Sequence, residues 1–295
     1  MAQIIDGKKV AEEIRAELKI RVDELVKSGK QVPGLVTILV GDNPASQSYV
    51  NSKSKACLEI GMLSKIEKRQ ENFSETELLK LVKSYNENKD YHGILVQLPL
   101  PKHINEQKII EAIDPAKDVD GFHPVSVGNL VIGKDTFYPC TPYGVLELLL
   151  RYNIPTEGKH VVVVGRSNIV GKPVANMLLQ KKKGANAVVT ICHSAAADLT
   201  LFTKSADILI AAIGKAFFIK ADMIKEGAVV IDVGINRVED AVSKKGYRLV
   251  GDVDFTEVEK KASFITPVPG GVGPMTIAML LKNTFEAYSR IRGVQ

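Results

Sequence analysis

Short hydrophobic runs alternate along the chain with longer segments in which apolar positions recur every three or four residues. The runs are rich in Val, Ile and Leu, which is typical of strands buried on both faces of a sheet. They span residues 35–40, 93–98, 160–165, 187–192, 208–213 and 229–233. Because helical segments separate them, the pattern predicts an α/β fold with parallel sheets covered by helices on both faces.

Capping residues locate several of the helices. Asp42 or Asn43, followed by Pro44, begins a helix that extends to about residue 60, where Gly61 ends it. Ser74 and Glu77 form a capping box that opens a second helix, and a last helix begins near Pro274. Residues 114–130 are rich in Asp, Gly and Pro and predict a long irregular segment, which inside a domain is usually functional.

One strand-to-helix junction has the residues of a phosphate-binding turn. The hydrophobic run ends in Gly165-Arg-Ser-Asn-Ile-Val-Gly171. In a Rossmann unit, one glycine permits the tight turn, another lets helix and strand approach, and the helix N-terminus binds phosphate. Ser167 replaces the usual second glycine, and the spacing is longer. The junction indicates nucleotide binding, with a plain strand-to-helix turn as the alternative.

The end of the following strand bears on the choice of dinucleotide. An NAD-selective site usually has Asp or Glu there to bond the ribose hydroxyls. Here the strand ends in Ile191-Cys-His193-Ser194, without an acid, and Arg166 supplies a cation near the turn. These residues favour the additional phosphate of NADP; the alternative is that Arg166 simply faces solvent.

Two motifs could carry acid–base chemistry. Tyr49 and Lys53 are four residues apart and therefore share a helix face. A partly desolvated lysine next to a phenol can exchange protons near neutral pH, although an exposed lysine and a packing tyrosine would give the same pattern. Gln97 interrupts an apolar strand, so its amide either braces the backbone or faces a site.

Asp118, Asp120 and His123 lie close together in the irregular segment. Their spacing matches no strong metal-ligand template, so metal binding is one reading and recognition of ligand ring nitrogens by a carboxylate is another. We expect no bound metal.

The composition bears on which ligands the protein binds and on where in the cell it is located. Lys and Arg exceed Asp and Glu by only 39 − 34 = 5, and Trp is absent. This allows small anionic ligands but argues against nucleic acid. Three distant cysteines without a Cys-x-x-Cys pair fit a reducing compartment. No apolar run approaches the ~18 residues needed to cross a membrane, and the charged N-terminal residues do not resemble a signal peptide. We expect a cytoplasmic protein.

The motifs together resemble the bifunctional methylenetetrahydrofolate dehydrogenase/methenyltetrahydrofolate cyclohydrolase family, over nearly the whole chain. The resemblance is carried by Ser48-Tyr-Val-Asn-Ser-Lys53, Gly93-Ile-Leu-Val-Gln-Leu-Pro-Leu-Pro101, Lys117-Asp-Val-Asp-Gly-Phe122, Pro139-Cys-Thr-Pro142, Gly165-Arg-Ser-Asn-Ile-Val-Gly-Lys-Pro173 and Thr266-Pro-Val-Pro-Gly-Gly-Val-Gly-Pro-Met-Thr276.

This resemblance implies two domains. Residues 1–140 with 275–295 would form an N-terminal α/β folate domain to which the last helix returns, and residues 141–274 a Rossmann NAD(P)-binding domain. It also implies a cleft between the domains that holds folate and nicotinamide together, and a homodimer assembled through the Rossmann domain.

The implied function is NADP-dependent oxidation of methylenetetrahydrofolate to methenyltetrahydrofolate, followed by hydrolysis to 10-formyltetrahydrofolate. By resemblance, Lys53 is the general acid and base, Tyr49 positions it, Gln97 bonds it, and Asp120 holds the pterin-like ring. Further folate contacts are implied for Val96, Leu98, Pro99, Pro269, Gly270 and Gly271. Dinucleotide contacts are implied for Thr141, Gly165, Arg166, Ser167, Ile169, Val170, Gly171, His193, Ser194, Ile235 and Gly273.

One departure and several alternatives remain. The family often has a basic residue after the His-Ser pair, whereas this chain has Ala195, which could reduce selectivity; Arg166 and Ser194 still match, and we expect NADP. The main alternative is a monofunctional NAD(P)-dependent dehydrogenase of the same two-domain plan. Others are a dehydrogenase of a small polar acid and a non-enzymatic nucleotide sensor. A formyltetrahydrofolate synthetase fusion would need a Gly-x-x-x-x-Gly-Lys-Ser/Thr loop, which the chain lacks.

Overall fold

The computed structural model describes residues 1–243 and 246–293. The chain forms two compact units, each built around a parallel sheet. Residues 1–12 and 139–276 make up what we call the large-sheet unit, and residues 13–138 with the segment from 277 onward make up the small-sheet unit. The sequence-based division kept residues 1–12 with the N-terminal domain. In the structure they group with the large-sheet unit because strand β1 (Gln3–Ile4) pairs with β11 (Phe264–Ile265).

The large-sheet unit has six parallel strands in the order β1-β11-β8-β7-β5-β6. The strands not yet given are β5 (His160–Val164), β6 (Val188–Cys192), β7 (Ile208–Ala211) and β8 (Val229–Asp232). Because β5 leads to β6 on one side and β7 returns on the other, the strand order reverses at the carboxyl ends of β5 and β7. In open α/β sheets such a reversal marks the ligand crevice.

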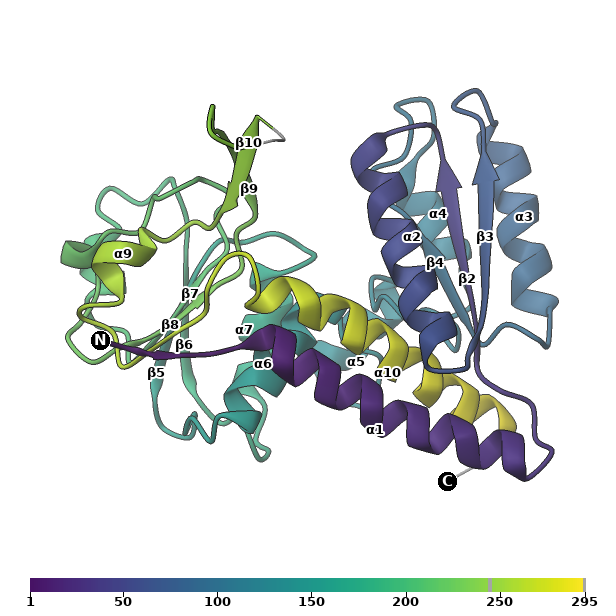
Figure 1. Ribbon diagram of the computed structural model, residues 1–295, viewed down its shortest axis with the longest axis horizontal. Helices are drawn as coiled ribbons and strands as arrows, with labels where there is room; N and C mark the ends of the chain where they lie inside the picture. The colour runs from purple at the N-terminus through teal and green to yellow at the C-terminus, as the bar shows by residue number, and fades with distance from the viewer. Residues whose placement is uncertain (244–245, 294–295) are drawn as a thin grey trace. The chain divides into compact units, whose positions relative to one another are not determined.

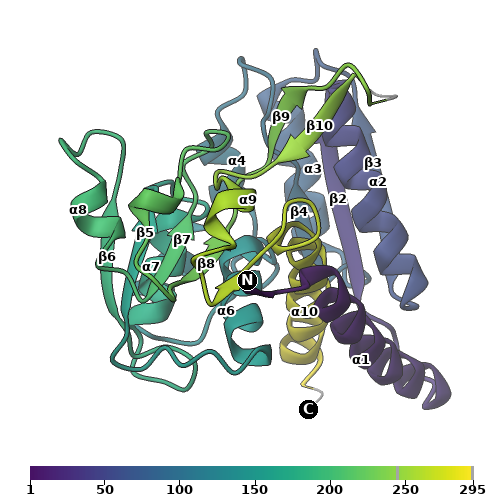
Figure 2. The ribbon, with the colours of Figure 1, turned by 60° about the vertical axis from the view of Figure 1, so that its left-hand side comes forward.

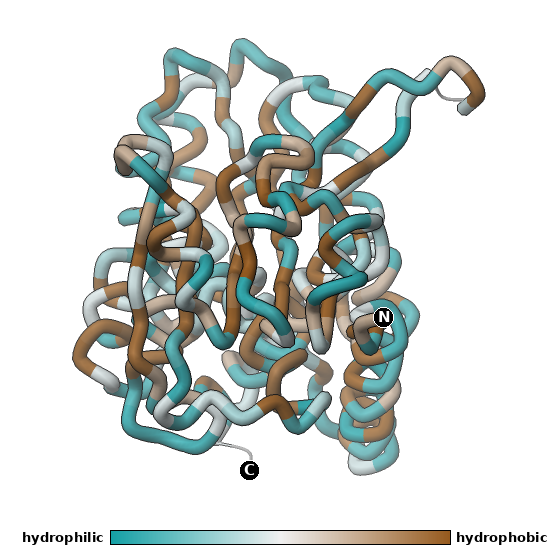
Figure 3. The backbone as a smooth tube through the Cα atoms, turned by 90° about the vertical axis from the view of Figure 1, so that its left-hand side faces the viewer, coloured by the Kyte–Doolittle hydropathy of each residue, from teal (hydrophilic) through white to brown (hydrophobic). Residues whose placement is uncertain are grey.

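The other elements of this unit are helices around the sheet and one hairpin (Figures 1 and 2). They are α6 (Cys140–Arg151), α7 (Gly171–Leu179), α8 (Thr200–Thr203), the 3-10 helix η1 (Ala221–Met223), α9 (Phe255–Val258), and the antiparallel strands β9 (Asn236–Glu239) and β10 (Tyr247–Val250). Strands β5, β7 and β8 are buried along almost their whole length. Figure 3 colours the chain by hydropathy and shows short hydrophobic stretches alternating with hydrophilic ones. The uninterrupted valine and isoleucine runs therefore form the core that fixes the sheet.

The small-sheet unit has three parallel strands in the order β3-β2-β4. They are β2 (Gly34–Val40), β3 (Leu63–Arg69) and β4 (Gly93–Val96), with α2 (Pro44–Glu59) and α3 (Glu75–Glu87) on opposite sides (Figure 1). Two shorter helices, α4 (Glu106–Ala112) and α5 (Pro124–Val131), complete the unit. Two long helices run from one unit into the other, α1 (Gly7–Lys27) and α10 (Val272–Arg292).

The structure corrects one prediction and refines others. Residues 114–130 are not irregular throughout, because α5 occupies 124–131. Pro124 suits the first turn, and the His123 ring accepts the N–H of Val125 and caps the helix. The last helix begins at Val272, two residues before the predicted Pro274. Within the described residues, no helix has the length and apolar character needed to span a bilayer.

Candidate active site

A buried lysine and a glutamine amide meet in the small-sheet unit. Asn43 caps α2 by accepting the N–H groups of Ala45 and Ser46, which sets the start of the helix that carries Lys53. The Lys53 side chain is largely buried, with 8% of the residue exposed, and its Nζ donates to Gln97 Oε1 at 3.0 Å. The predicted pairing of these two residues is therefore present in the geometry.

Gln97 follows directly after β4 and is held on two sides. Its backbone N–H donates to the Ile38 carbonyl at 2.9 Å, and its Nε2 donates to the Leu98 carbonyl at 2.7 Å. One end of the amide therefore braces the backbone, and the other end contacts Lys53. Among the described residues no carboxylate lies within ion-pair distance of Lys53, so the neighbour of its amine is a neutral acceptor.

Two neighbours on α2 contrast with Lys53. Tyr49 lies one turn earlier and is 51% exposed, which leaves its ring accessible to a ligand beside the lysine. Lys55 points to another side of the helix, is exposed, and lies 3.8 Å from the Glu59 carboxylate. Lys53 and Lys55 therefore share a helix but differ in burial and in partner.

The two aspartates in the loop before α5 differ in burial and in hydrogen bonding. Asp118 is buried and accepts the N–H of His123 at 2.9 Å and the hydroxyl of Ser126 at 2.7 Å. Burial raises the pKa of Asp118. Asp120 is only half-buried, and its carboxylate has no hydrogen-bond partner in the part of the chain described. Of the two, Asp120 is the carboxylate available to a ligand, while Asp118 shapes the loop.

The metal reading of this loop is weakened by the same contacts. His123 uses one ring nitrogen to cap α5, and its other ring nitrogen lies 3.3 Å from the Glu111 carbonyl. The residues described contain no group of three His, Cys, Asp or Glu side chains arranged to hold a metal ion.

The turn after β5 lies in the large-sheet unit and is tightly packed against its neighbours. A methyl group on Gly165 would overlap the Ala212 carbonyl, and one on Gly171 would overlap the Gly165 carbonyl. Ser167 Oγ accepts the N–H groups of Val170 and Gly171 at 3.1 and 3.3 Å and so closes the turn into α7. Both glycines are required by close backbone approach, as a phosphate-binding turn demands.

The side chains around this turn are open to ligands. Arg166, Ser167 and Ile169 are exposed, and Val170 is half-buried. After β6, the His193 ring accepts the N–H of Ala195 at 3.2 Å, and Ser194 is exposed. The glycine cradle, the helix N-terminus and the absence of an acid at 193–195 together fit a dinucleotide.

Further predicted residues gather in the same unit. Thr141 Oγ1 lies 3.0 Å from Thr276 Oγ1, a partner that sequence reasoning missed although it closes the last family motif. A Cβ on Gly273 would lie 3.5 Å from the Ile235 side chain, so these two predicted residues are neighbours.

The predicted folate residues do not all lie in one unit. Tyr49, Lys53, Gln97 and Asp120 belong to the small-sheet unit, as do Val96, Leu98 and Pro99. Residues 269–271 belong to the large-sheet unit, where the Gly270 carbonyl accepts the Lys8 N–H and Gly271 N–H donates to the Pro267 carbonyl.

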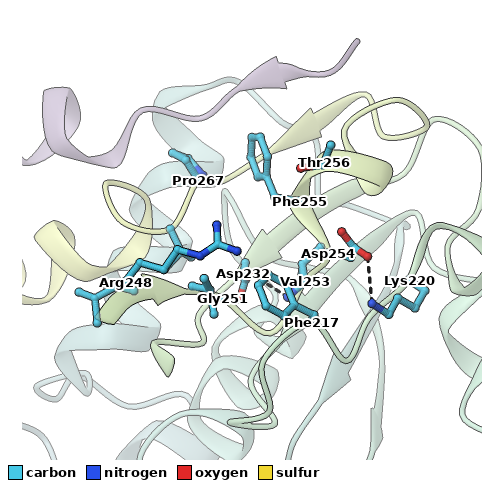
Figure 4. Close-up of a pocket in the computed structure, with 13 residues that line it drawn as sticks. Phe217, Lys220, Asp232, Arg248, Gly251, Val253, Asp254, Phe255, Thr256 and Pro267 are labelled. Atoms are coloured by element: carbon cyan, nitrogen blue, oxygen red, sulfur yellow. Dashed lines mark hydrogen bonds and ion pairs between the residues drawn. The ribbon is translucent and has the colours of Figure 1, made fainter. Parts of the chain in front are cut away.

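A cavity of about 570 Å³ opens beside residues 267–268 in the large-sheet unit (Figure 4). Its wall includes Phe217, Arg248, Phe255 and the carboxyl end of β8 at Asp232. Burial raises the pKa of Asp232 to about 7. The cavity does not contain the predicted turn at 165–171.

Comparison with known proteins places the chain in a family. The "tetrahydrofolate dehydrogenase/cyclohydrolase, catalytic domain" matches residues 5–120, and the "NAD(P)-binding domain" of the same family matches residues 139–292. The chain is 61% identical over 293 residues to the bifunctional protein FolD of Chlorobium chlorochromatii, with 99% of both chains covered. It is 59% identical over 287 residues to that of Chloroherpeton thalassium, with 97% and 98% covered.

Solved structures of similar fold indicate the same family. The bifunctional FolD methylenetetrahydrofolate dehydrogenase/cyclohydrolase of Campylobacter jejuni superimposes with a TM-score of 0.93 at 50% identity, covering 99% of this chain and 100% of that one. The Trypanosoma brucei methylenetetrahydrofolate dehydrogenase-cyclohydrolase, solved with NADP cofactor and an inhibitor, gives a TM-score of 0.93 at 41% identity, covering 99% and 98%.

The fold and the two sites thus define a two-part α/β enzyme with an NAD(P)-binding domain. The chain belongs to the tetrahydrofolate dehydrogenase/cyclohydrolase family. These findings confirm the predictions of family, of fold class, and of an NAD(P)-dependent dehydrogenase joined to a cyclohydrolase in one chain.

Proposed function

We propose that the protein oxidises methylenetetrahydrofolate with NADP+ and hydrolyses the resulting methenyltetrahydrofolate to 10-formyltetrahydrofolate. Family membership supports both reactions. The observation that carries the proposal is the buried Lys53 amine, 3.0 Å from a neutral glutamine oxygen. A lysine used only for solubility would extend into water, as Lys55 does.

The oxidation requires mainly that the methylene carbon of the folate be positioned next to the hydride acceptor. The methylene carbon loses a hydride, and the neighbouring ring nitrogen stabilises the methenyl cation that remains, so no strong base is needed. When bound, NADP+ supplies the hydride acceptor. Asp120 would hold the pterin-like ring by accepting its N–H groups, and Tyr49 would pack beside it; the unpartnered Asp120 carboxylate and the exposed Tyr49 ring support these roles.

The hydrolysis requires proton transfers. Water adds to the methenyl carbon, and the bond from that carbon to one ring nitrogen then breaks. The water loses both of its protons in the course of the reaction: one ends on the leaving nitrogen and the other passes to solvent. Lys53 Nζ can accept a proton from the water and donate one to the nitrogen. Gln97 fixes the direction of that amine, because its own amide is anchored to the Leu98 carbonyl.

The dinucleotide would bind at the turn formed by residues 165–171 and at residues 193–194. Arg166 is exposed beside this turn, and no acid follows β6, which supports NADP over NAD. Thr141, Ile235 and Gly273 would line the nicotinamide side. Pro269, Gly270 and Gly271, with Val96, Leu98 and Pro99, would contact the folate.

A pair of matched variants tests the role of Lys53. Lys53→Met should lower the rate of methenyltetrahydrofolate hydrolysis by about a hundredfold or more, since general acid–base groups contribute that much. Lys55→Met, on the same helix, should hydrolyse at the wild-type rate. The measurement is the loss of methenyl absorbance without dinucleotide, corrected for uncatalysed hydrolysis. Normal turnover in Lys53→Met would refute the role.

We propose three further properties. By ligand, the folate domain would comprise residues 1–140 with 275–295 and the dinucleotide domain residues 141–274, although residues 1–12 pack with the large-sheet unit. The protein is a homodimer through the dinucleotide domain, as the family resemblance implies, and light scattering should then give twice the monomer mass. It acts in the cytoplasm, which its three cysteines, far apart in the sequence and without a Cys-x-x-Cys pair, support.

A further inference from the structure

A fully buried carboxylate, Asp252, ties three segments of the large-sheet unit together. It lies just after β10, and one of its oxygens accepts the N–H groups of Ile213 and Gly214 at 2.7 and 2.9 Å. Its other oxygen accepts the side-chain Nδ2 of Asn236 at 2.9 Å. Asp252 thus joins the loop after β7 to the segment after β8.

A second buried carboxylate holds Asp252 in place. Asp232, at the end of β8, accepts the N–H groups of Asp252 and Val253, each at 2.9 Å, and that of Gly234 at 3.0 Å. Figure 4 shows Asp232, Gly251 and Val253 together at the wall of the cavity.

Two glycines make this packing possible. A methyl group on Gly234 would overlap the Asp252 carboxylate, and one on Gly251 would overlap the Asp232 carboxylate. In the sequence, this pair of carboxylates with its two glycines corresponds to Asp-x-Gly-x-Asn at 232–236 and Gly-Asp at 251–252.

The segments held by Asp252 border the dinucleotide turn. The Ala212 carbonyl packs against Gly165, directly before the two N–H groups that Asp252 binds. This is the point where the strand order reverses, between β5 and β7. On the other side, Asn236 adjoins Ile235, whose side chain faces Gly273.

We propose that Asp252 is a positioning residue for the dinucleotide: by binding Ile213, Gly214 and Asn236 it fixes the loops on both sides of the crevice in their binding conformation. The inference rests on the proposed function, because it concerns the same dinucleotide site.

The chemistry requires a carboxylate at this position. All three neighbours of Asp252 are donors, so both of its oxygens must accept. In Asp252→Asn, one end of the amide becomes a donor and faces another donor in either orientation. Exchanging the two residues, as Asp252→Asn with Asn236→Asp, restores one donor and one acceptor across this contact. The oxygen of the new amide at position 252 then remains for the two backbone groups.

The experiment compares NADP+ affinity, measured by calorimetry, with hydrolysis of methenyltetrahydrofolate, which uses no dinucleotide. Asp252→Asn should weaken NADP+ binding by about tenfold or more. Its hydrolysis rate should stay within about twofold of wild type, since Lys53 and Gln97 lie in the other unit. The exchange variant should regain most of the affinity. Asp222→Asn, at an exposed position, is the matched control and should bind normally.

The other possible results distinguish failure of the inference about Asp252 from failure of the proposed function. Unchanged affinity in Asp252→Asn would overturn the inference. So would loss of affinity and hydrolysis together without recovery in the exchange variant, because that pattern means general unfolding. If wild type itself binds no NADP+, the proposed function fails before the variants are compared.

Discussion

Arg166 is the side chain placed to distinguish NADP from NAD. It is exposed beside the turn at 165–171, and no acidic residue follows β6. Arg166→Ala should weaken NADP+ binding by about tenfold, the size of a lost charged hydrogen bond, and NAD+ binding by less than about twofold. Lys172→Ala is a fair control, because the Lys172 amine is already bonded to Asn168 at 2.7 Å. Equal loss for both dinucleotides in Arg166→Ala would contradict this role.

At the scale of residues, the sequence predicts which residues are candidates for the site. It does not predict which of them already have hydrogen-bond partners within the protein. The spacing of Tyr49 and Lys53 places them on one helix face, as observed. Residue spacing could not decide between Asp118 and Asp120, and only the family resemblance favoured Asp120. The difference between them depends on hydrogen bonds to Asp118 from residues 122, 123 and 126, which form only in the folded loop. Asp252 and Asn236 were missed for the same reason: their contacts join segments far apart in the chain.

At the scale of elements, the junction of β5 and α7 depends on Gly171. A methyl group there would overlap the Gly165 carbonyl, which is backbone and cannot rotate away. Gly171→Ala should therefore weaken NADP+ binding by at least about tenfold and lower the stability of the protein by about 1–3 kcal/mol. Calorimetry and urea unfolding measure the two effects.

A second glycine gives the control for that variant. Gly128 lies in α5, and a methyl group there would meet no atom within 4 Å. Gly128→Ala should keep NADP+ affinity and gain up to about 1 kcal/mol of stability, because alanine favours the helix. If Gly171→Ala bound NADP+ as well as Gly128→Ala, close packing at the turn would not be what makes the site.

Elements with strong local signals were predictable, and those defined by packing were not. The uniform valine runs and the capping residues located the strands β2, β5, β7 and β8 and the helix α2. Helix α5 was missed because its N-cap residue His123 and its first residue Pro124 are also typical of loops. The hydrogen bond from the Val125 N–H to the His123 ring, which caps the helix, is visible only in the folded structure.

For the whole molecule, His92 should link stability to pH. It is buried, its Nδ1 accepts the Gly34 N–H at 3.1 Å, and burial, with Arg292 and Lys117 nearby, lowers its pKa to about 4. Between pH ~6.5 and ~4 the unfolded chain binds a proton that the folded protein does not, so stability falls as the pH is lowered. After allowance for screening, this loss should be about 2 kcal/mol.

Urea unfolding across that pH range measures the loss. His92→Gln should start less stable but lose less on acidification, because glutamine does not titrate. His103→Gln, at an exposed histidine, should keep the wild-type dependence. An unaltered pH dependence in His92→Gln would assign the effect to other groups.

One chain is expected to perform two consecutive reactions. The decisive measurement is a single time course of purified protein with methylenetetrahydrofolate and NADP+, following NADPH, methenyl and formyl products together. We predict NADPH and 10-formyltetrahydrofolate in equal amounts, with methenyltetrahydrofolate accumulating only in Lys53→Met. Absence of NADPH with both NADP+ and NAD+, or methenyl product that disappears no faster than without enzyme, would show that the chain does not perform both reactions.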